Sequence, residues 1–198
     1  MKTFLTTALG CLLFTATAAA QTDSISVVTA DWKSEKIAPG IKLKQAAFNK
    51  NLFSSNQYIS ILEIKQRKRN QIKIGHEPQK RVATSEFGKR ENALAAINGT
   101  FFDVAKGGSV DYLRAEGKVM HTNRLNKDNT RAIHQKAAVV INDGRAHIEE
   151  WDGTDNWEDK IVGQEVMLSG PLLLDEGQEK ILDSTAFVKL RHPRSVVA

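Results

Sequence analysis

Short runs of alternating apolar and polar residues recur along most of the chain, separated by clusters rich in Gly, Pro, Asn and Asp. Such a period of two is typical of strands that bury one face. The pattern predicts strands at residues 25–32, 41–43, 58–64, 72–74, 93–97, 137–141, 146–151 and 195–198, with further short strands in 109–121 and 165–182. One polar stretch, 85–92, is compatible with a helix. The prediction is an α+β fold with a mixed, mainly antiparallel sheet and few helices.

Two turns between these strands have clear signals. Asn142-Asp143-Gly144 lies between apolar runs and predicts a tight hairpin, because glycine accepts positive φ. The basic run 65–73 lies between 58–64 and 72–74, which predicts a hairpin with a solvated tip. Such a run can also bind an anionic partner as an adaptor, in a salt-dependent manner. No aromatic residues interleave with its charges to stack bases, so no nucleic-acid partner is predicted.

The first 20 of the 198 residues have the features of a secretion signal. Lys2 is followed by an apolar stretch, and Ala18-Ala19-Ala20 offers a cleavage site. A lipoprotein signal through Gly10-Cys11 is the alternative. No transmembrane run is predicted after cleavage, so the expected location is periplasmic or secreted. The predicted organisation is a signal peptide over 1–20, an N-terminal strand and loop region over 21–57, and the main domain over 58–198.

The cysteine count, the net charge and the positions of the histidines limit the kinds of site that the chain can contain. Cys11 is the only cysteine, so cleavage after residue 20 leaves a mature chain without disulfides or a catalytic thiol. The formal net charge of +5 is a mild excess. The histidines at 76, 121, 134, 147 and 192 have no compact ligand spacing and are interpreted as surface residues, without a readable metal site. Nucleotide-binding and serine-hydrolase signatures are absent, and the sequence assigns no cofactor.

Three short clusters carry groups suited to binding or catalysis: Asn98-Gly99-Thr100-Phe101-Phe102-Asp103, Ser169-Gly170-Pro171 and Arg191-His192-Pro193-Arg194. In the first, glycine lets the backbone approach a ligand, and Asn98 and Thr100 can bind hydroxyls or phosphate oxygens. In the third, two arginines can donate paired hydrogen bonds to phosphate. Each cluster also has a structural interpretation: a strand end with an Asn-Gly turn, a plain turn, and a solvated basic loop.

The order and spacing of these clusters resemble the phosphodiester glycosidase family, which includes the domain of the mammalian mannose 6-phosphate uncovering enzyme. The resemblance runs from about Tyr58 to the last residue, through AINGTFFD, SVDYLRAEGKVMH, AAVVINDGRAHI, LSGPLLLDEG and FVKLRHPRS. Its most specific parts are Asn98-Gly99 with Phe102, and His192-Pro193-Arg194. It implies hydrolysis of the bond between a sugar and a phosphate, as in N-acetylglucosamine-1-phosphate diesters.

The resemblance also implies roles for individual residues. Asp103 is the candidate catalytic carboxylate, and Arg194 is expected to stabilise the leaving phosphate. The predicted substrate-binding residues are Asn98, Gly99, Thr100, Phe102, Ser169, Gly170, Arg191 and His192. Glycosidases generally use two carboxylates. Glu116 and Asp111 are interpreted instead as turn and strand-surface residues, so no second carboxylate is assigned.

The sequence departs from the family pattern in two ways. The family often has glycine or serine at the position of Thr100. It also continues past the His-Pro-Arg element into further strands, a helix and a glycine-rich motif. The resemblance therefore implies that these residues are the N-terminal portion of a longer domain, which is incomplete here. The alternative is a non-catalytic exported protein that binds an envelope glycan or a sugar-phosphate polymer.

Overall fold

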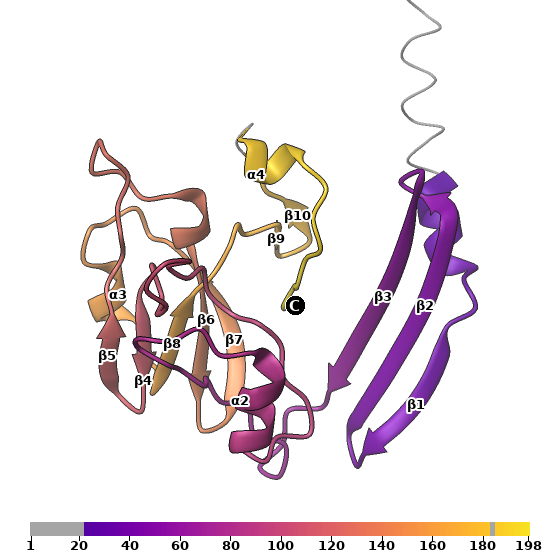
Figure 1. The fold of residues 1–198 in the computed structure, drawn as a ribbon, viewed down its shortest axis with the longest axis horizontal. Coiled ribbons are helices and arrows are strands. Elements are labelled where there is room, and N and C mark those ends of the chain that lie inside the picture. The colour runs from indigo at the N-terminus through magenta and orange to yellow at the C-terminus, as the bar shows by residue number, and fades with distance from the viewer. Residues whose placement is uncertain (1–21, 183–184) are drawn as a thin grey trace, which may run out of the picture. The chain divides into compact units, whose positions relative to one another are not determined.

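The computed structural model describes residues 22–182 and 185–198, and the chain divides into two compact units, one ending at Lys65 and the other beginning at Gln66 (Figure 1). The signal peptide predicted over 1–20 lies outside the described residues. The predicted boundary between residues 57 and 58 falls inside a strand of the first unit, β3 (Ser55–Ile64).

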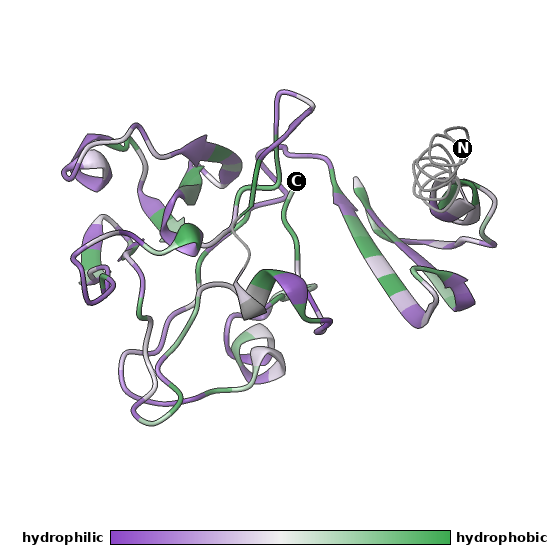
Figure 2. Ribbon diagram, turned by 90° about the horizontal axis from the view of Figure 1, so that it is seen from above, coloured by the Kyte–Doolittle hydropathy of each residue, from purple (hydrophilic) through white to green (hydrophobic). Residues whose placement is uncertain are grey.

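The first unit is a three-stranded antiparallel sheet. Its strands β1 (Lys33–Ala38), β2 (Ile41–Leu52) and β3 lie in the order β1-β2-β3. Ile41 pairs with Ile64 at one end of β2 and β3, and Leu52 pairs with Ser55 at the other. Figure 2 shows bands of polar and apolar residues following one another along these strands. The strands predicted at 41–43 and 58–64 are confirmed.

The strand predicted over 25–32 is wrong, because residues 22–28 are helical. Two adjacent valines break the alternation here, and Val27 packs with the buried Ala46, Phe48 and Leu52 of β2. The indole Nε1 of Trp32 donates to the Val27 carbonyl at 3.0 Å. The segment therefore covers one face of the sheet as a helix.

The hairpin predicted between 58–64 and 72–74 is also wrong, since β3 pairs with β2 instead. The basic run does contain a turn, with an antiparallel bridge between Arg67 and Asn70. Beyond it, Ile72 donates its N–H to the Gly144 carbonyl at 3.0 Å. The long alternating stretch of β2 offered β3 more pairing positions than the short run after the turn did.

The second unit contains a five-stranded antiparallel sheet in the order β5-β4-β8-β6-β7. Its strands are β4 (Leu113–Ala115), β5 (Lys118–His121), β6 (Ala137–Asn142), β7 (Arg145–Glu150) and β8 (Glu165–Leu168). A separate hairpin pairs β9 (Leu174–Asp175) with β10 (Gln178–Glu179). The predicted Asp-Gly hairpin is confirmed as β6 and β7.

Short helices complete the unit: α2 (Thr84–Arg90), the 3₁₀ helix η1 (Ile133–Gln135), α3 (Trp157–Lys160) and α4 (Ala186–Lys189). The predicted helix over 85–92 corresponds to α2, and the α+β class is confirmed. No helix within the described ranges is long and apolar enough to cross a membrane.

The strands predicted at 93–97 and 195–198 are not formed in the structure. Leu94 and Ile97 are 67% and 59% exposed, and in the described part of the chain no strand pairs with their segment. An apolar run becomes a strand only where a neighbouring strand accepts its backbone hydrogen bonds.

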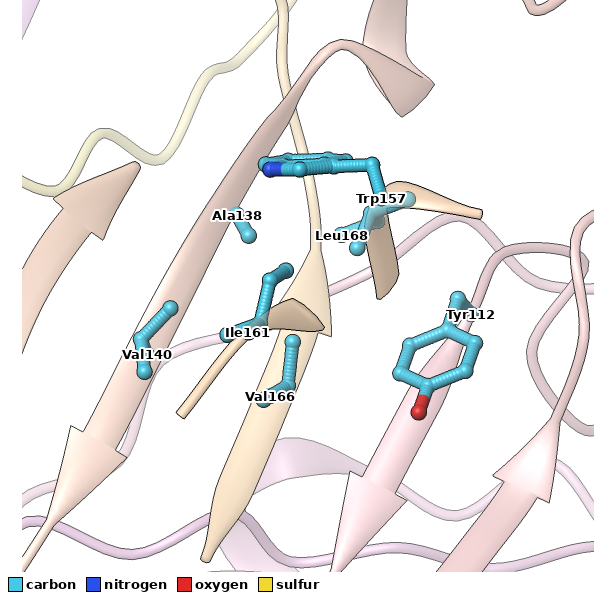
Figure 3. Packing of buried hydrophobic residues seen from close by; sticks show 7 residues of the cluster. All are labelled: Tyr112, Ala138, Val140, Trp157, Ile161, Val166 and Leu168. Carbon is cyan, nitrogen blue, oxygen red and sulfur yellow. The ribbon is translucent and has the colours of Figure 1, made fainter. Parts of the chain in front are cut away.

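The core of the second unit packs against one face of the sheet. Figure 3 shows Ala138 of β6 and Leu168 of β8 near Trp157, and Val140 and Val166 of the same strands near Ile161. The alternate residues of β6 are buried as well, which places apolar contacts on both faces of this strand. A strand covered on both faces is a rigid support for the loops at its ends.

Candidate active site

Three central strands bring their connecting loops to one edge of the sheet. Because β8 is antiparallel to both β4 and β6, its end lies beside their beginnings. Leu168 donates its N–H to the Tyr112 carbonyl, and Ser169 donates to the Ala137 carbonyl, each at 3.1 Å. We call this end the site edge. It receives the residues that precede β4 and β6 and those that follow β8.

Two of the predicted clusters meet at the site edge. The Ser169 hydroxyl donates to the Gly99 carbonyl at 3.4 Å, which joins segments 70 residues apart. A Cβ placed on Gly99 would lie 2.5 Å from Met167 Sδ, and one on Gly170 would lie 3.2 Å from His134 Cα. The two glycines therefore let their loops pack directly on the edge.

The third cluster is held at the site edge by Ser195, the residue that follows it in the chain. The hydroxyl of Ser195 donates to Asn98 Oδ1 at 2.6 Å, across a separation of 97 residues. Arg194 directly precedes Ser195, and its Nη2 donates to the Leu190 carbonyl at 3.3 Å. Arg191 and His192 are exposed on the same segment. The structure thus brings Asn98, Gly99 and Ser169 together with the backbone that carries Arg194.

Thr100 and Phe102 occupy different surroundings. The Thr100 hydroxyl lies 2.9 Å from Ser109 Oγ and 3.3 Å from Asp111 Oδ2, so it faces the interior of the site edge. Phe102 is exposed and lines a shallow hollow. The other residues of that hollow are Lys80, Arg81, Val82, Ala83 and Gly108. Phe102 forms an isolated antiparallel bridge with Ser109.

Asp103 is held in a turn by both of its carboxylate oxygens. Oδ1 accepts from the N–H groups of Ala105 and Lys106 at 2.9 and 3.0 Å, and Oδ2 accepts from Arg124 Nη2 at 2.8 Å. The Arg124 guanidinium, helped by these two N–H groups, lowers the pKa of Asp103 to about 2. Near neutral pH this carboxylate is ionised and has no proton to donate. Its catalytic role stays a prediction.

Asp111 is the residue that the sequence analysis misplaced. It is 0% exposed, so its interpretation as a strand-surface residue is wrong. Gln135 Nε2 donates to its Oδ1 at 2.8 Å, and His134 Nε2 lies 3.2 Å from the same oxygen. The available signal was an aspartate between Val110 and Tyr112 in a run predicted to contain a strand, where an inward carboxylate needs partners. Glu116 lies in the β4–β5 turn, as interpreted.

Gly108 supports the loop that leads to Asp111, and its replacement by alanine tests how tightly that loop packs. Gly108 has φ +76°, and a Cβ there would collide with the Pro78 carbonyl oxygen and lie 2.9 Å from His121 Cε1. Gly117 has φ +75° with no atom within 4 Å of its Cβ position. Gly117→Ala is therefore expected to cost about 1 kcal/mol from backbone strain alone, and Gly108→Ala about 2–4 kcal/mol.

Urea unfolding of both variants measures this difference. Equal losses of unfolding free energy would show that positive φ alone sets the cost at Gly108, and that the contact with Pro78 contributes nothing.

A family model described as phosphodiester glycosidase matches residues 91–198, which is more than half of the chain. No curated protein and no solved structure matches the chain. The matched region contains Asn98, Ser169 and Arg194 and lies wholly within the second unit. It confirms the resemblance drawn from the sequence, with a start later than Tyr58.

Proposed function

We propose that the complete protein hydrolyses the bond between an N-acetylglucosamine-like sugar and a phosphodiester. The basis for this proposal is that the chain belongs to the phosphodiester glycosidase family. We propose also that it does so after export, in the periplasm or outside the cell. The export proposal rests on the signal-like residues 1–20.

One observation carries the substrate assignment: the hydrogen bond from Ser195 to Asn98 at 2.6 Å. It puts the segment with Arg191 and Arg194 beside the segment with Asn98 and Gly99. Guanidinium groups suit a phosphate, because they donate two parallel hydrogen bonds and keep their charge. An amide side chain and backbone carbonyl suit sugar hydroxyls. The contact between the two segments therefore supports a substrate that contains both a phosphate and a sugar.

The chemistry of the leaving group fits the same arrangement. When the bond between the anomeric carbon and the phosphate oxygen breaks, the oxygen leaves as a phosphate monoester, which is weakly basic. Little proton donation is needed for such a group to leave. Positive charge placed at the developing phosphate stabilises the transition state instead, and Arg194 is the residue proposed to supply it.

The test is hydrolysis of an N-acetylglucosamine-1-phosphate diester by the complete protein, assayed in exported and cytosolic fractions of producing cells. Release of free sugar and a phosphate monoester, in the exported fraction, is expected. Two control substrates are bis(p-nitrophenyl) phosphate, which has no sugar, and p-nitrophenyl N-acetylglucosaminide, which has no phosphate. Neither should be cleaved.

Three other outcomes would contradict the proposal in different ways. Cleavage of the sugar-free diester would indicate a general phosphodiesterase. Saturable binding of sugar phosphates with no cleavage over a panel of sugar phosphodiesters would support the non-catalytic glycan-binding alternative. Activity in the cytosolic fraction alone would reject export.

A further inference from the structure

The site edge contains a pair of titratable side chains outside the three predicted clusters. Asp111 precedes β4 and His134 lies in η1, next to the start of β6, and His134 Nε2 lies 3.2 Å from Asp111 Oδ1. The Asp111 side chain is 0% exposed, whereas that of His134 is 22% exposed. Asp111 is therefore the inner member of the pair, and the imidazole is the member that a ligand can reach.

Three groups surround the Asp111 carboxylate. It accepts from Gln135 Nε2 at 2.8 Å and from Thr100 Oγ1 at 3.3 Å. The His134 ring presents Nε2 to this carboxylate, 3.2 Å from Oδ1. With the hydrogen on Nε2, a neutral imidazole has its lone pair on the other ring nitrogen, Nδ1.

The ring is also fixed from other sides. The Phe101 ring lies over His134 with centroids 4.2 Å apart and an interplanar angle of 32°. Gly170 packs against the His134 backbone, where a Cβ would lie 3.2 Å from its Cα. The charged partner of this ring is Asp111.

The pair lies next to the site proposed for the sugar phosphate. Gly170 directly follows Ser169, whose hydroxyl donates to the Gly99 carbonyl. Thr100, which follows Gly99, contacts Asp111. His134 thus contacts Gly170 and Phe101, which belong to the two segments assigned to substrate binding.

We infer that His134 is the general base of the glycosidase reaction and that Asp111 is its positioning residue; this rests on the proposed function. Nδ1 takes a proton from a water molecule, whose oxygen forms a bond to the anomeric carbon. The bond from that carbon to the phosphate oxygen breaks, and its electron pair leaves with the phosphate monoester. The proton passes from the imidazolium to solvent, which restores the base. Asp111 keeps the ring in the required tautomer and balances its positive charge.

The assignment of His134 supplies the base that the reaction needs to activate the attacking water. A phosphate monoester leaves without a strong acid, so activation of the attacking water is the step that needs a side chain. Asp103 is a weak base, since its pKa is lowered to about 2 by Arg124 and the turn N–H groups. A neutral imidazole is a much better proton acceptor near neutral pH.

The decisive variant is His134→Gln in the complete protein. We expect kcat to fall by about 10²- to 10⁴-fold with KM nearly unchanged, which is the usual contribution of a general base. His147→Gln is a matched control, because His147 is also paired with a carboxylate, Glu149 at 2.9 Å, on the exposed strand β7. That variant should keep the wild-type rate.

The split between kcat and KM separates catalysis from a structural role. Asp111→Asn should lower kcat with KM nearly unchanged, because the amide keeps the shape of the side chain but cannot balance positive charge on the ring. A purely structural role would lower the amount of folded enzyme and leave kcat per folded molecule unchanged. Added imidazole should restore activity to His134→Ala, which covers the case in which glutamine disturbs the loop.

The possible failures can be told apart. If the wild type cleaves no sugar phosphodiester, the proposed function is wrong and the role of His134 is rejected with it. If the wild type cleaves the substrate while His134→Gln keeps kcat within about threefold, only the assignment of His134 is overturned. An Asp111→Asn variant whose kcat stays within about threefold of the wild type would overturn the role of Asp111.

Discussion

Replacement of Arg131 by alanine is expected to lower the free energy of unfolding by about 3–5 kcal/mol, the usual cost of breaking a buried ion pair. Arg131 and Glu158 side chains are 8% and 9% exposed. Two guanidinium nitrogens of Arg131 contact the two carboxylate oxygens, at 2.5 and 2.7 Å. Asn123 donates to the same carboxylate. Removing the arginine would leave a buried negative charge whose remaining donors, the Asn123 amide and the Glu158 backbone N–H, are both neutral.

Measurements at two pH values make the test specific. Burial raises the pKa of Glu158, but hydrogen bonds and charge from Arg131 outweigh it, so the pKa lies below its usual 4.5. Glu158 therefore contributes stability that is present above pH 4.5 and is lost as pH falls through its lowered folded pKa. In Arg131→Ala the hydrogen bonds and charge from Arg131 are lost while burial remains, so the pKa of Glu158 rises. Acid then protonates the carboxyl, and the gap in stability to the wild type narrows.

Lys160→Ala is the control for this experiment, because Lys160 makes a surface ion pair with Asp152 at 2.9 Å. It should cost less than about 1 kcal/mol. A loss at Arg131 no larger than that at Lys160 in urea unfolding at pH 7 would mean that the buried pair does not support α3.

A large loss of activity is expected from Arg194→Ala. If Arg194 stabilises the charge that develops on the leaving phosphate, its removal should lower kcat/KM by about 10²- to 10³-fold, as loss of one such donor does elsewhere. Arg194→Lys should recover only part of this rate, since an ammonium cannot donate two parallel hydrogen bonds. Steady-state hydrolysis of the N-acetylglucosamine-1-phosphate diester measures both variants.

Arg145→Ala is the matched control, because Arg145 is an exposed arginine at the β6–β7 hairpin, away from the site edge. Its rate should equal that of the wild type. An Arg194→Ala enzyme that also cleaves at the wild-type rate would remove Arg194 from the phosphate site, and Arg191 would then be the next arginine to test.

The hairpin of β6 and β7 shows which features could be predicted from the sequence. Asp143 and Gly144 adopt φ of 49° and 72°, the positive values that a two-residue hairpin turn requires. This information is local, because the turn residues and both strands lie within a few positions of one another. The helix α2 was predictable for the same reason.

The errors arose where a partner far along the chain decides the structure. Residues 93–97 are apolar, yet no strand accepts them within the described ranges, and the run stays extended and exposed. Ile72 was matched to the neighbouring run 58–64, but its N–H donates to Gly144. Local pattern gives no indication of such long-range choices.

The residues of the candidate site also fall into those that the sequence indicated and those that it did not. Asn98, Gly99 and Ser169 stood out because glycine turns with polar neighbours are conspicuous in a sequence. Asp111 and His134 did not, because each has an ordinary neighbourhood and the pair exists only through the antiparallel order of β4, β8 and β6. A histidine in a polar loop gives no sign that a buried carboxylate will lie beside it.

The contacts that assemble the site edge have a consequence for the order of folding. Ser195 and Asn98 are 97 residues apart, and Ser169 and Gly99 are 70 apart. Each contact closes a long loop, whose entropic cost must be met before the contact forms. Local hairpins such as β6–β7 form sooner than contacts of this kind. A chain still emerging from the ribosome, or still unfolded, therefore has its turns and hairpins before it has anything able to hold a sugar phosphate.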